Sequence, residues 1–451
     1  MNLHRQVRHY YWLFTEFVQK HAALLVVSFI AAFLLIIALL NFFPFFSSRI
    51  LQRREIIGMS GQYSLREIPL SVRRQVSNPL IMIDQNGEIQ PLLANSWELL
   101  DGGKTYRFHL RNDLFWADGK RFTSKGISYS FPDVTMTPVD DYTIDFTLKA
   151  PLNIFPIYLT QPVIKQPFVG IGALYRVESY KHKKNVITSI NLAPNKPNLP
   201  YRIYRFYSSE EDLINAYKKG EITQFITQDQ TTVAYFKPWR NTKVTQTIDY
   251  SKIMALFFNN QSGALQEREI RKAFAYATPS FPERGDHAKG PIPPTSWAYY
   301  SGVKEYPYNE EHARELLKKN VTSTVSASFK LYTFADTIDF AGTLKKYYQK
   351  IGAHIDVKVA QQKPPDEFDM FLAIWNPPDD PDQFYFWYST QEQTNITKFK
   401  SLKIDKLLED GRKVLNVKQR QSIYKDFQKA ISDELPAYFM YHPYEYIIER
   451  R

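Results

Sequence analysis

The fold of this 451-residue chain is decided by residues 93–131, LANSWELLDGGKTYRFHLRNDLFWADGKRFTSKGISYSF. Apolar and polar side chains alternate from Tyr106 to Leu110, which is the pattern of a half-buried strand. Asp101–Gly103 and Asp118–Gly119 supply turns, because glycine accepts positive φ angles without steric cost. The segment therefore predicts a strand, a turn, a second strand, a second turn and then a short helix.

The helix at the end of this segment is predicted to be short. Thr123 or Ser124 is suited to cap its first turn. Gly126 weakens the helix, and Pro132 ends it because proline lacks a backbone N–H and clashes with the preceding turn. The alternating residues 139–148 then predict a further strand almost at once.

As a run of residue types, residues 93–131 closely resemble the signature of the family 5 extracellular solute-binding proteins, the peptide-, dipeptide- and nickel-binding subunits of ABC importers. Further segments resemble motifs of that family in the same order. They are VGIGALYRV (169–177), EEDLINAYKKGEI (210–222), IMALFFNN (253–260), REIRKAFAYA (268–277), FDMFLAIW (368–375) and RQSIYKDFQKAISDELP (420–436). Gly220 is also where a helix is expected to end. The collinear set covers residues 55–449, so the chain is identified as a member of this family.

The resemblance implies an α/β, bilobal fold like that of periplasmic binding proteins, with two mixed-sheet lobes and a hinge. We expect the first lobe over residues 55–250, completed by residues 439–451. The second lobe is expected over residues 251–438. An accessory subdomain is expected within the first lobe at about residues 77–165, and Pro132 indicates that it is smaller than in the family.

A long apolar segment precedes the lobes. Residues 22–46 contain no charged residue, and as a helix the most apolar part, residues 22–40, would extend about 28 Å, close to the thickness of a bilayer core. A buried core helix and a cleaved signal peptide are the alternatives. The run ends in NFFPFF, with no small-x-small cleavage site, so we favour an uncleaved anchor. The chain has no cysteine, which excludes anchoring through a lipid-modified cysteine.

The expected topology has a cytoplasmic tail at residues 1–21, a membrane anchor at residues 22–46 and a basic linker at residues 47–54. Three basic residues lie on each side of the span, so the positive-inside rule does not decide the orientation. The resemblance decides it, since it implies that the large domain is extracellular or periplasmic. We therefore expect a single-pass protein of the cell membrane.

The net charge of +11 is not concentrated in a binding patch. Residues 1–54 hold six basic residues and one acidic residue, and the rest of the chain holds 51 basic and 45 acidic residues. A nucleic-acid-binding protein usually carries a clustered basic stripe or patch. We therefore expect a slightly basic, solvated surface and no nucleic acid partner.

Candidate ligand-binding residues follow one predicted strand. Trp375 ends a buried strand, where pockets of α/β sheets form, and the resemblance implies that it faces the ligand; a packed core tryptophan is the alternative. Peptide-binding members carry an aspartate three residues after this tryptophan, where Pro378 stands here. Asp379 and Asp380 follow it. Either a shifted loop brings an acid to the peptide ammonium, or the segment is a solvated acidic turn; its spacing does not favour a calcium loop.

Two further places are candidates for lining the cleft. Asn259 and Asn260 end a strand at the predicted junction of the lobes, where an amide can donate to and accept from a peptide backbone; turn chemistry is the alternative. Trp387 and Tyr388 are candidate wall residues, and alternation predicts that at least one of them lies in the core.

The resemblance implies a receptor that captures peptides or similar small solutes between its lobes, closes about the hinge and delivers them to ABC permease subunits, while a separate subunit hydrolyses ATP. A tethered binding or sensory module that no longer serves import is the alternative. The motifs G-x-S-x-G, G-x-x-x-x-G-K-[ST] and H-E-x-x-H are absent from the sequence. We expect no catalytic residue, metal site or cofactor, and a monomer.

Overall fold

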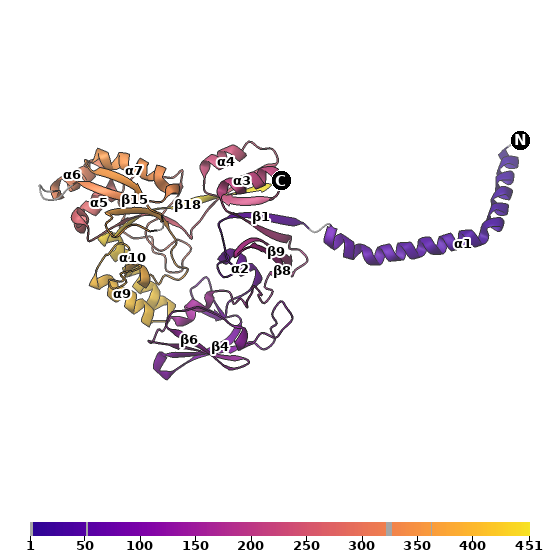
Figure 1. The fold of residues 1–451 in the computed structure, drawn as a ribbon, viewed down its shortest axis with the longest axis horizontal. Helices are drawn as coiled ribbons and strands as arrows, with labels where there is room; N and C mark the ends of the chain where they lie inside the picture. Colours follow the sequence, from indigo (N-terminus) through magenta and orange to yellow (C-terminus); the bar gives the residue numbers. More distant parts are fainter. Residues whose placement is uncertain (1–2, 51–52, 322–326, 362) are drawn as a thin grey trace.

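A two-lobed body follows a long N-terminal helix, α1 (Leu3–Ile50) (Figure 1). The computed structural model describes residues 3–50, 53–321, 327–361 and 363–451, and it describes the side chains of α1 from Val7 to Ile37. Strand β18 (Ala437–Arg450) passes from one lobe to the other. The predicted α/β bilobal fold is confirmed, whereas the predicted domain limits stay a prediction.

A 12-stranded mixed sheet runs through both lobes in the order β16-β15-β17-β13-β18-β11-β1-β10-β9-β8, and β12 and β14 also pair with β18. The strands are β1 (Arg54–Ser60), β8 (Tyr175–Lys183), β9 (Val186–Pro194), β10 (Tyr201–Tyr207), β11 (Gln224–Thr227), β12 (Thr242–Ile248), β13 (Ile253–Phe258), β14 (Gly285–His287), β15 (Ser328–Thr333), β16 (His354–Val359) and β17 (Met370–Trp375). The first part of β18 pairs with β13, and its last part pairs with β11 and β12. The hinge is therefore built on a strand that belongs to both lobes.

Helices cover both faces of this sheet. They are α2 (Leu70–Val76), α3 (Glu210–Lys219), α4 (Gln230–Phe236), α5 (Arg268–Tyr276), α6 (Glu310–Asn320), α7 (Ile338–Lys350), α8 (Phe384–Trp387), α9 (Leu402–Lys413) and α10 (Val417–Glu434). Adjacent residues of a strand point to opposite faces. In β17, Leu372 accordingly joins the core under α5, α6 and α7, whereas Phe371 joins the core under α9 and α10.

Several predicted elements are confirmed. Helix α3 ends at Gly220, whose φ of 79° lies in the left-handed region that glycine adopts without strain. Its other end is capped by the hydroxyl of Ser209, which accepts from the N–H of Asp212. Strand β17 ends at Trp375, as predicted for a buried strand.

A separate four-stranded sheet, β4-β5-β7-β6, forms the accessory subdomain. Its strands are β4 (Ala94–Leu100), β5 (Thr105–Leu110), β6 (Val134–Asp140) and β7 (Thr143–Leu148), and the short hairpin of β2 (Ile81–Ile83) and β3 (Ile89–Pro91) lies beside it. The predicted short helix is only a 3-10 turn, Ser124–Gly126, and Thr123 does not cap it. The hydroxyl of Ser124 donates instead to the carbonyl of Asp140.

The strand predicted at residues 139–148 is present as β7 from Thr143 to Leu148, but its predicted start is wrong, because the first residues form the end of β6 and the turn of the β6–β7 hairpin. The side chain of Asp140 accepts a hydrogen bond from the N–H of Tyr142 at 2.7 Å. An aspartate that bonds to its own backbone two residues on stabilises a turn. Local turn chemistry therefore outweighs the alternation of apolar residues at this point.

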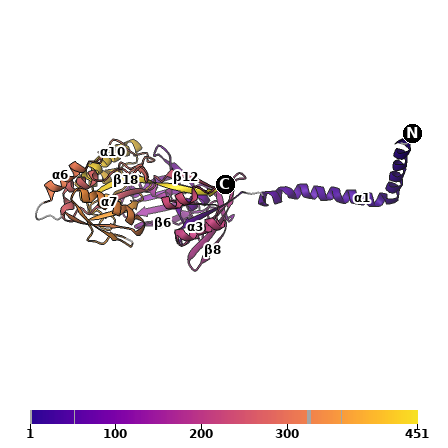
Figure 2. The ribbon, with the colours of Figure 1, turned by 90° about the horizontal axis from the view of Figure 1, so that it is seen from above.

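Helix α1 projects from the body and bends within its N-terminal half (Figures 1 and 2). The stretch Val7–Ile37 is long and apolar enough to cross a membrane, and none of its most apolar window is buried against the body. The helix continues to Ile50, and β1 begins at Arg54, so residues 47–50 of the predicted linker are helical. Residues 51 and 52 of that linker, and the side chains of the predicted anchor from residue 38 on, lie outside the described residues.

Replacement of Gly285 by alanine is expected to destabilise the hinge region. A Cβ at this position of β14 would lie 1.9 Å from the carbonyl oxygen of His442 on β18, so the strand backbone must shift. We expect a loss of roughly 1–3 kcal/mol in the free energy of unfolding, as for other overpacking changes. The measurement is urea denaturation of the detergent-solubilised protein, followed by tryptophan fluorescence.

The matched control is Gly342→Ala in α7, where an added Cβ meets nothing within 4 Å. Alanine favours a helix over glycine, so this variant is expected to keep or raise stability by up to about 1 kcal/mol. Equal destabilisation by both substitutions would contradict the close approach of β14 to β18.

Candidate functional site

Two cavities lie where the lobes meet. The hinge cavity, of about 570 Å³, lies beside β18 and is lined by residues of both lobes, among them Ser60, Thr227, Ile374 and Tyr441. The subdomain cavity, of about 470 Å³, lies between the segment 74–92 and the C-terminal lobe. Both volumes fall in the range of roughly 300–1,000 Å³ that is typical of small-ligand sites.

The position of the hinge cavity follows from the direction of the strands. Strand β1 is parallel to β10 and β11, and β15 is parallel to β16 and β17. Ligands of open α/β sheets bind at the carboxyl ends of such strands. Ser60 and Thr227 mark these ends in the N-terminal lobe, and Ile374 lies next to the last residue of β17 in the C-terminal lobe.

The walls of the hinge cavity carry more acids than bases. The acids are Glu210, Asp229, Asp336, Asp339 and Glu445, and the bases are Lys252 and Arg284. Burial raises the pKa of Glu445, and the negative charge of Asp249 raises it further. The amide nitrogen of Gln228 is buried in this wall and has no hydrogen-bond partner among the described residues. Such a wall favours a ligand with a positive group and a hydrogen-bond acceptor.

An ion pair links the two walls of the subdomain cavity. Arg74, on α2 of the N-terminal lobe, donates to the carboxylate of Asp379 at 2.7 Å, and Asp379 follows β17 in the C-terminal lobe. Their side chains are 51% and 65% exposed, so the pair contributes little to stability. The indole N–H of Trp297 lies in the same lining, buried and without a partner in the described part of the chain.

A second polar contact joins the accessory subdomain to the C-terminal lobe. The hydroxyl of Tyr158 donates to Asp382 at 2.9 Å, and Arg412 donates to the same carboxylate at 2.9 Å and to the Tyr158 oxygen at 3.0 Å. Burial raises the pKa of Tyr158, and Asp382 raises it further. Burial is the largest influence on the pKa of Arg412 and lowers it, but the charges of Asp382 and Tyr158 and the hydrogen bond to Asp382 together outweigh burial, so the pKa lies above its ordinary value. The three groups therefore hold the lobes together in this arrangement.

Asp380 lies away from both cavities. Its carboxylate accepts two hydrogen bonds from the guanidinium of Arg420 on α10, at 2.6 and 3.0 Å, and both side chains are buried in the C-terminal lobe. The two aspartates of the predicted acidic segment thus have different roles. Asp379 reaches the subdomain cavity, whereas Asp380 ties the loop to α10.

The aromatic candidates lie in or beside the core of the C-terminal lobe. Trp387 is buried, and its N–H donates to the amide oxygen of Gln383 at 2.8 Å. The Tyr388 hydroxyl donates to Glu409 at 2.6 Å, and its ring stacks on Phe384 at a centroid distance of 4.1 Å. Neither Trp387 nor Tyr388 lines either cavity.

Trp375 lines neither cavity. Its ring packs against Phe386, Trp387 and Phe439, with centroid distances of 5.3 to 6.1 Å. Its indole N–H is nevertheless buried and without a hydrogen-bond partner among the described residues. An unpaired buried donor is costly, so this N–H is a ready partner for a ligand oxygen.

The predicted position of Asn259 and Asn260 at the junction of the lobes is wrong. Ile253 pairs with Trp375, whereas Phe258 pairs with Met370, because β13 runs antiparallel to β17. The end of β13 therefore lies beside the start of β17, about 16–17 Å along the strands from Trp375. The two amides instead serve a turn.

That turn uses both side-chain amide nitrogens and the amide oxygen of Asn259, whereas the buried amide oxygen of Asn260 has no partner among the described residues. The Asn259 amide donates to the carbonyl of Phe368 at 2.8 Å and accepts from the N–H of Gln261 at 3.1 Å. The Asn260 amide donates to the carbonyls of Phe258 and Thr397, at 2.9 and 3.2 Å. Both asparagines therefore stabilise a turn after the strand, which was the alternative to ligand binding.

Sequence reasoning missed most of the polar groups between the lobes. Arg74, Tyr158, Trp297 and Gln228 come from four segments with no shared motif, and only the folded chain brings them to the cavities. The aromatic segment at residues 297–300, WAYY, was the available signal for Trp297. No local pattern marks the other three.

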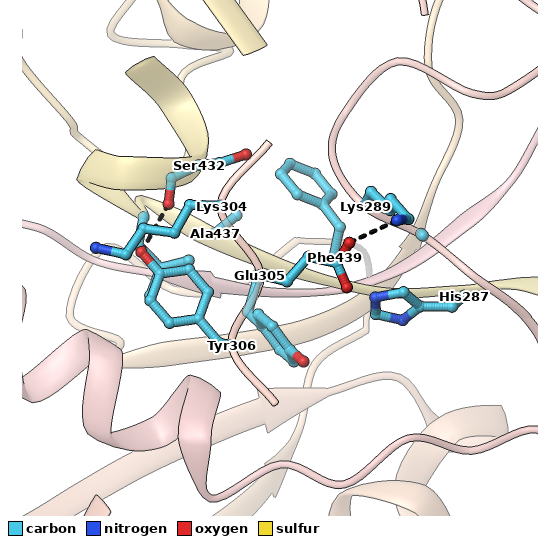
Figure 3. A pocket seen from close by; sticks show the side chains of 11 residues that line it. His287, Lys289, Lys304, Glu305, Tyr306, Ser432, Ala437 and Phe439 are labelled. Carbon is cyan, nitrogen blue, oxygen red and sulfur yellow. Dashed lines mark hydrogen bonds and ion pairs between the residues drawn. The ribbon is translucent and has the colours of Figure 1, made fainter. Parts of the chain in front are cut away.

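A third cavity, of about 20 Å³, lies inside the C-terminal lobe (Figure 3). Its lining includes the ion pair of Lys289 and Glu305, at 2.5 Å, and Tyr306, whose hydroxyl donates to the carbonyl of Ser432 at 2.9 Å. A volume of this size holds about one water molecule. Within the described part of the chain no group of three or more His, Cys, Asp or Glu is arranged for a metal ion.

Asp380→Ala is expected to destabilise the C-terminal lobe strongly, because Arg420 would remain buried without a counter-charge. Removal of one partner of a buried ion pair costs about 3–5 kcal/mol. The control Asp410→Ala removes the exposed i,i+4 pair with Lys406, and we expect a change of at most about 0.5 kcal/mol. Urea denaturation gives both values. Similar small effects of the two substitutions would show that the buried pair does not hold the loop.

The chain resembles known solute-binding proteins along most of its length. The model of the bacterial extracellular solute-binding proteins, family 5 (middle), matches residues 88–395. The chain is 24% identical to heme-binding protein A of Haemophilus influenzae, over 54% of this chain and 56% of that protein, so it spans about half of that relative. It is 21% identical to the probable D,D-dipeptide-binding periplasmic protein DdpA of Escherichia coli, over 78% of this chain and 79% of that protein.

A solved structure shows the same fold. The oligopeptide-binding protein AppA of Bacillus subtilis in complex with a nonapeptide superposes with a TM-score of 0.68, at 19% identity, over 89% of this chain and 95% of that one. The family match covers more than half of the chain. The chain belongs to the family 5 bacterial extracellular solute-binding proteins, which are the substrate-binding proteins of ABC transporters and not enzymes.

Proposed function

We propose that this protein is a membrane-anchored receptor that captures peptides outside the cytoplasm for an ABC importer. The observation that carries the peptide assignment is the pair of Arg74 and Asp379, whose opposite charges belong to opposite lobes and line one cavity. One relative is named a probable D,D-dipeptide-binding protein, and a structural neighbour was solved in complex with a nonapeptide. Permease subunits and a separate ATPase are the proposed partners.

A peptide carries the two charges that this pair offers to bind. Its α-ammonium fits the carboxylate of Asp379, and its terminal carboxylate fits the planar guanidinium of Arg74, which can donate two parallel hydrogen bonds. The pair is exposed and therefore weak, so a ligand can replace it at small cost. Peptide-binding members of the family bind the ammonium with an aspartate at the position of Pro378. In this protein Asp379, the next residue, is proposed to take that role.

The indole N–H of Trp375 and that of Trp297 extend this proposed site. Both are buried donors without partners among the described residues. A bound peptide offers carbonyl oxygens, which accept such bonds. Trp297 lines the cavity itself, whereas Trp375 follows Ile374 on β17 and packs on the opposite face of the sheet, in the same core as Trp297.

Ligand capture is proposed to act through the hinge. A peptide that bridges Arg74 and Asp379 contacts both lobes only when the lobes are close together. The closed arrangement therefore binds the peptide more tightly than the open one, and the peptide favours closure by that difference in affinity. The contact of Tyr158 with Asp382 and Arg412 adds a ligand-independent attraction between the lobes. Because of this attraction, the ligand would need to add only a little free energy to favour the closed arrangement over the open one.

Anchoring is proposed through α1, with residues 1–21 cytoplasmic, residues 22–46 in the membrane and the lobes outside. The exposed, apolar stretch of this helix supports an anchor. A cleaved signal sequence would have the same appearance. A tethered sensory module of the same fold is the second candidate, and the presence of Pro378 in place of the family's aspartate favours it.

Asp379→Asn is expected to weaken binding of free peptides about tenfold or more, because it removes one charge-assisted hydrogen bond worth about 1.4 kcal/mol or more. Isothermal titration with dipeptides to decapeptides, with and without N-terminal acetylation, measures the effect. N-acetylated peptides should bind the parent weakly and should show no further loss with the variant. Asp410→Asn, on the surface of α9, is the control and should bind as the parent does.

Two outcomes would contradict this prediction. Equal affinity of the Asp379→Asn variant for free peptides would show that Asp379 does not anchor the ammonium. Absence of binding and of thermal stabilisation across the whole peptide set would contradict the peptide assignment and favour the sensory alternative.

Tyr158→Phe is expected to loosen the closed arrangement without unfolding the protein, because it removes only the hydroxyl that contacts Asp382 and Arg412. Small-angle X-ray scattering of the unliganded variant in detergent should show a larger radius of gyration than the parent. Tyr235→Phe, at an exposed tyrosine of α4, is the control and should leave the radius unchanged. An unchanged radius in both variants would show that this contact does not hold the lobes together.

A further inference from the structure

We propose that residues 7–20 form an amphipathic helix that lies flat on the cytoplasmic surface of the membrane, and that α1 enters the bilayer only after His21. In this arrangement the apolar side of the helix contacts the lipids of the inner leaflet. This inference rests on the proposed function, which places the anchor in α1 with its N-terminus in the cytoplasm.

The backbone of α1 is broken at the place where the two parts would meet. His21 has φ −115° and ψ 16°, which are not helical values, although the helix continues on both sides of it. The N-terminal part of α1 turns sharply away from the rest in both views (Figures 1 and 2). A helix that turns from the membrane plane into the bilayer needs such a break.

The part before the break has an apolar stripe. Its members recur at spacings of three and four residues, which places them on one side of a helix. They are Val7, Tyr10, Tyr11, Phe14, Phe17 and Val18. The four aromatic residues are more than half exposed, and none of them packs against the body of the protein. Aromatic rings of this kind prefer the interface between headgroups and acyl chains.

The opposite side of the same part is polar. Arg8, His9, Glu16, Gln19 and Lys20 lie there, and Trp12 interrupts them. Arg8 and Lys20 exceed the single acid by one charge, and the positive excess matches the anionic lipids of a cytoplasmic leaflet. An apolar stripe beside a basic, polar face is the pattern of a helix that lies in the membrane surface.

The part after the break has a different pattern. Between residues 22 and 37 the only polar side chain is that of Ser28, so this part is apolar on every side. A helix that is apolar all round suits the interior of a bilayer. The change from a one-sided to an all-round apolar pattern coincides with His21.

Length also shows that only part of α1 can lie in the hydrocarbon. The helix Leu3–Ile50 has 48 residues, and at 1.5 Å per residue it is about 72 Å long, whereas the hydrocarbon core is about 30 Å thick. A span that started at Val7 would place Glu16 and Lys20 in the hydrocarbon. A start after His21 leaves both in the headgroup region.

Cysteine scanning tests this arrangement in the full-length protein, since the chain has no cysteine of its own. Single cysteines at Tyr10, Phe14 and Phe17 test the stripe, and those at Thr15 and Gln19 test the polar side. Each carries a nitroxide label in vesicles of phosphatidylethanolamine and phosphatidylglycerol. Accessibility is measured with oxygen, which concentrates in lipid, and with a water-soluble nickel chelate.

We expect oxygen to reach the stripe positions better and the nickel chelate to reach the polar positions better, with a period of 3.6 residues. Nickel accessibility on every side would show a free cytoplasmic tail and overturn the inference. Protection on every side would show that residues 7–20 are inside the bilayer, which overturns it equally.

A matched pair of charge substitutions makes the test independent of labelling geometry. Phe14→Glu, within the stripe, is expected to raise nickel accessibility at position 17 severalfold, whereas Thr15→Glu, on the polar side, should leave it unchanged. An equal response to both substitutions would contradict a lipid-facing stripe.

Labels at Ala31 and Ile36 report separately on the anchor. If these two labels are protected by lipid but accessibility along residues 7–20 is not periodic, only the proposal of a surface helix is contradicted. If they are exposed to water, or if alkaline carbonate extracts the protein from the vesicles, the proposed anchoring itself fails and the surface helix fails with it.

Discussion

The arrangement of the molecule depends on one strand that pairs in both lobes. Strand β18 contacts β13 through Ala437 to Tyr441 and contacts β11 and β12 through Tyr444 to Arg450. Because these hydrogen bonds lie on a continuous backbone, the strand fixes the register of one lobe against the other. The hinge cavity lies beside this strand, with Tyr441 and Tyr444 in its lining.

Charged groups between and within the lobes fall into two physical classes. Arg420 and Asp380 are almost fully buried and hold a loop to a helix inside one lobe. Arg74 and Asp379 are half exposed and join different lobes. The buried pair is too costly to break during a working cycle, whereas the exposed pair exchanges easily with water or with a charged ligand. Of two adjacent aspartates in one loop, Asp380 thus forms a buried ion pair that fixes the loop, and Asp379 forms an exposed ion pair that can exchange its partner.

Local sequence predicted much of the fold. The alternation around Phe108, the stop at Gly220 and the end of a buried strand at Trp375 all depend on neighbouring residues, and each is present in the structure. The site was less predictable. The position of Asn259 depends on the antiparallel pairing of β13 with β17, and the approach of Arg74 to Asp379 joins residues 305 positions apart. Such contacts are set by the tertiary fold, which no single segment encodes.

The short connection between α1 and the first strand has a consequence for transport kinetics. Helix α1 reaches Ile50 and β1 begins at Arg54, so three residues separate them, a reach of about 10 Å when extended. If α1 is the anchor, as proposed, the receptor would search for a permease by diffusion in two dimensions, within a thin layer at the membrane. Tethering of this kind raises the effective concentration of one partner near the other, so docking to the permease can be intrinsically weak and still be frequent.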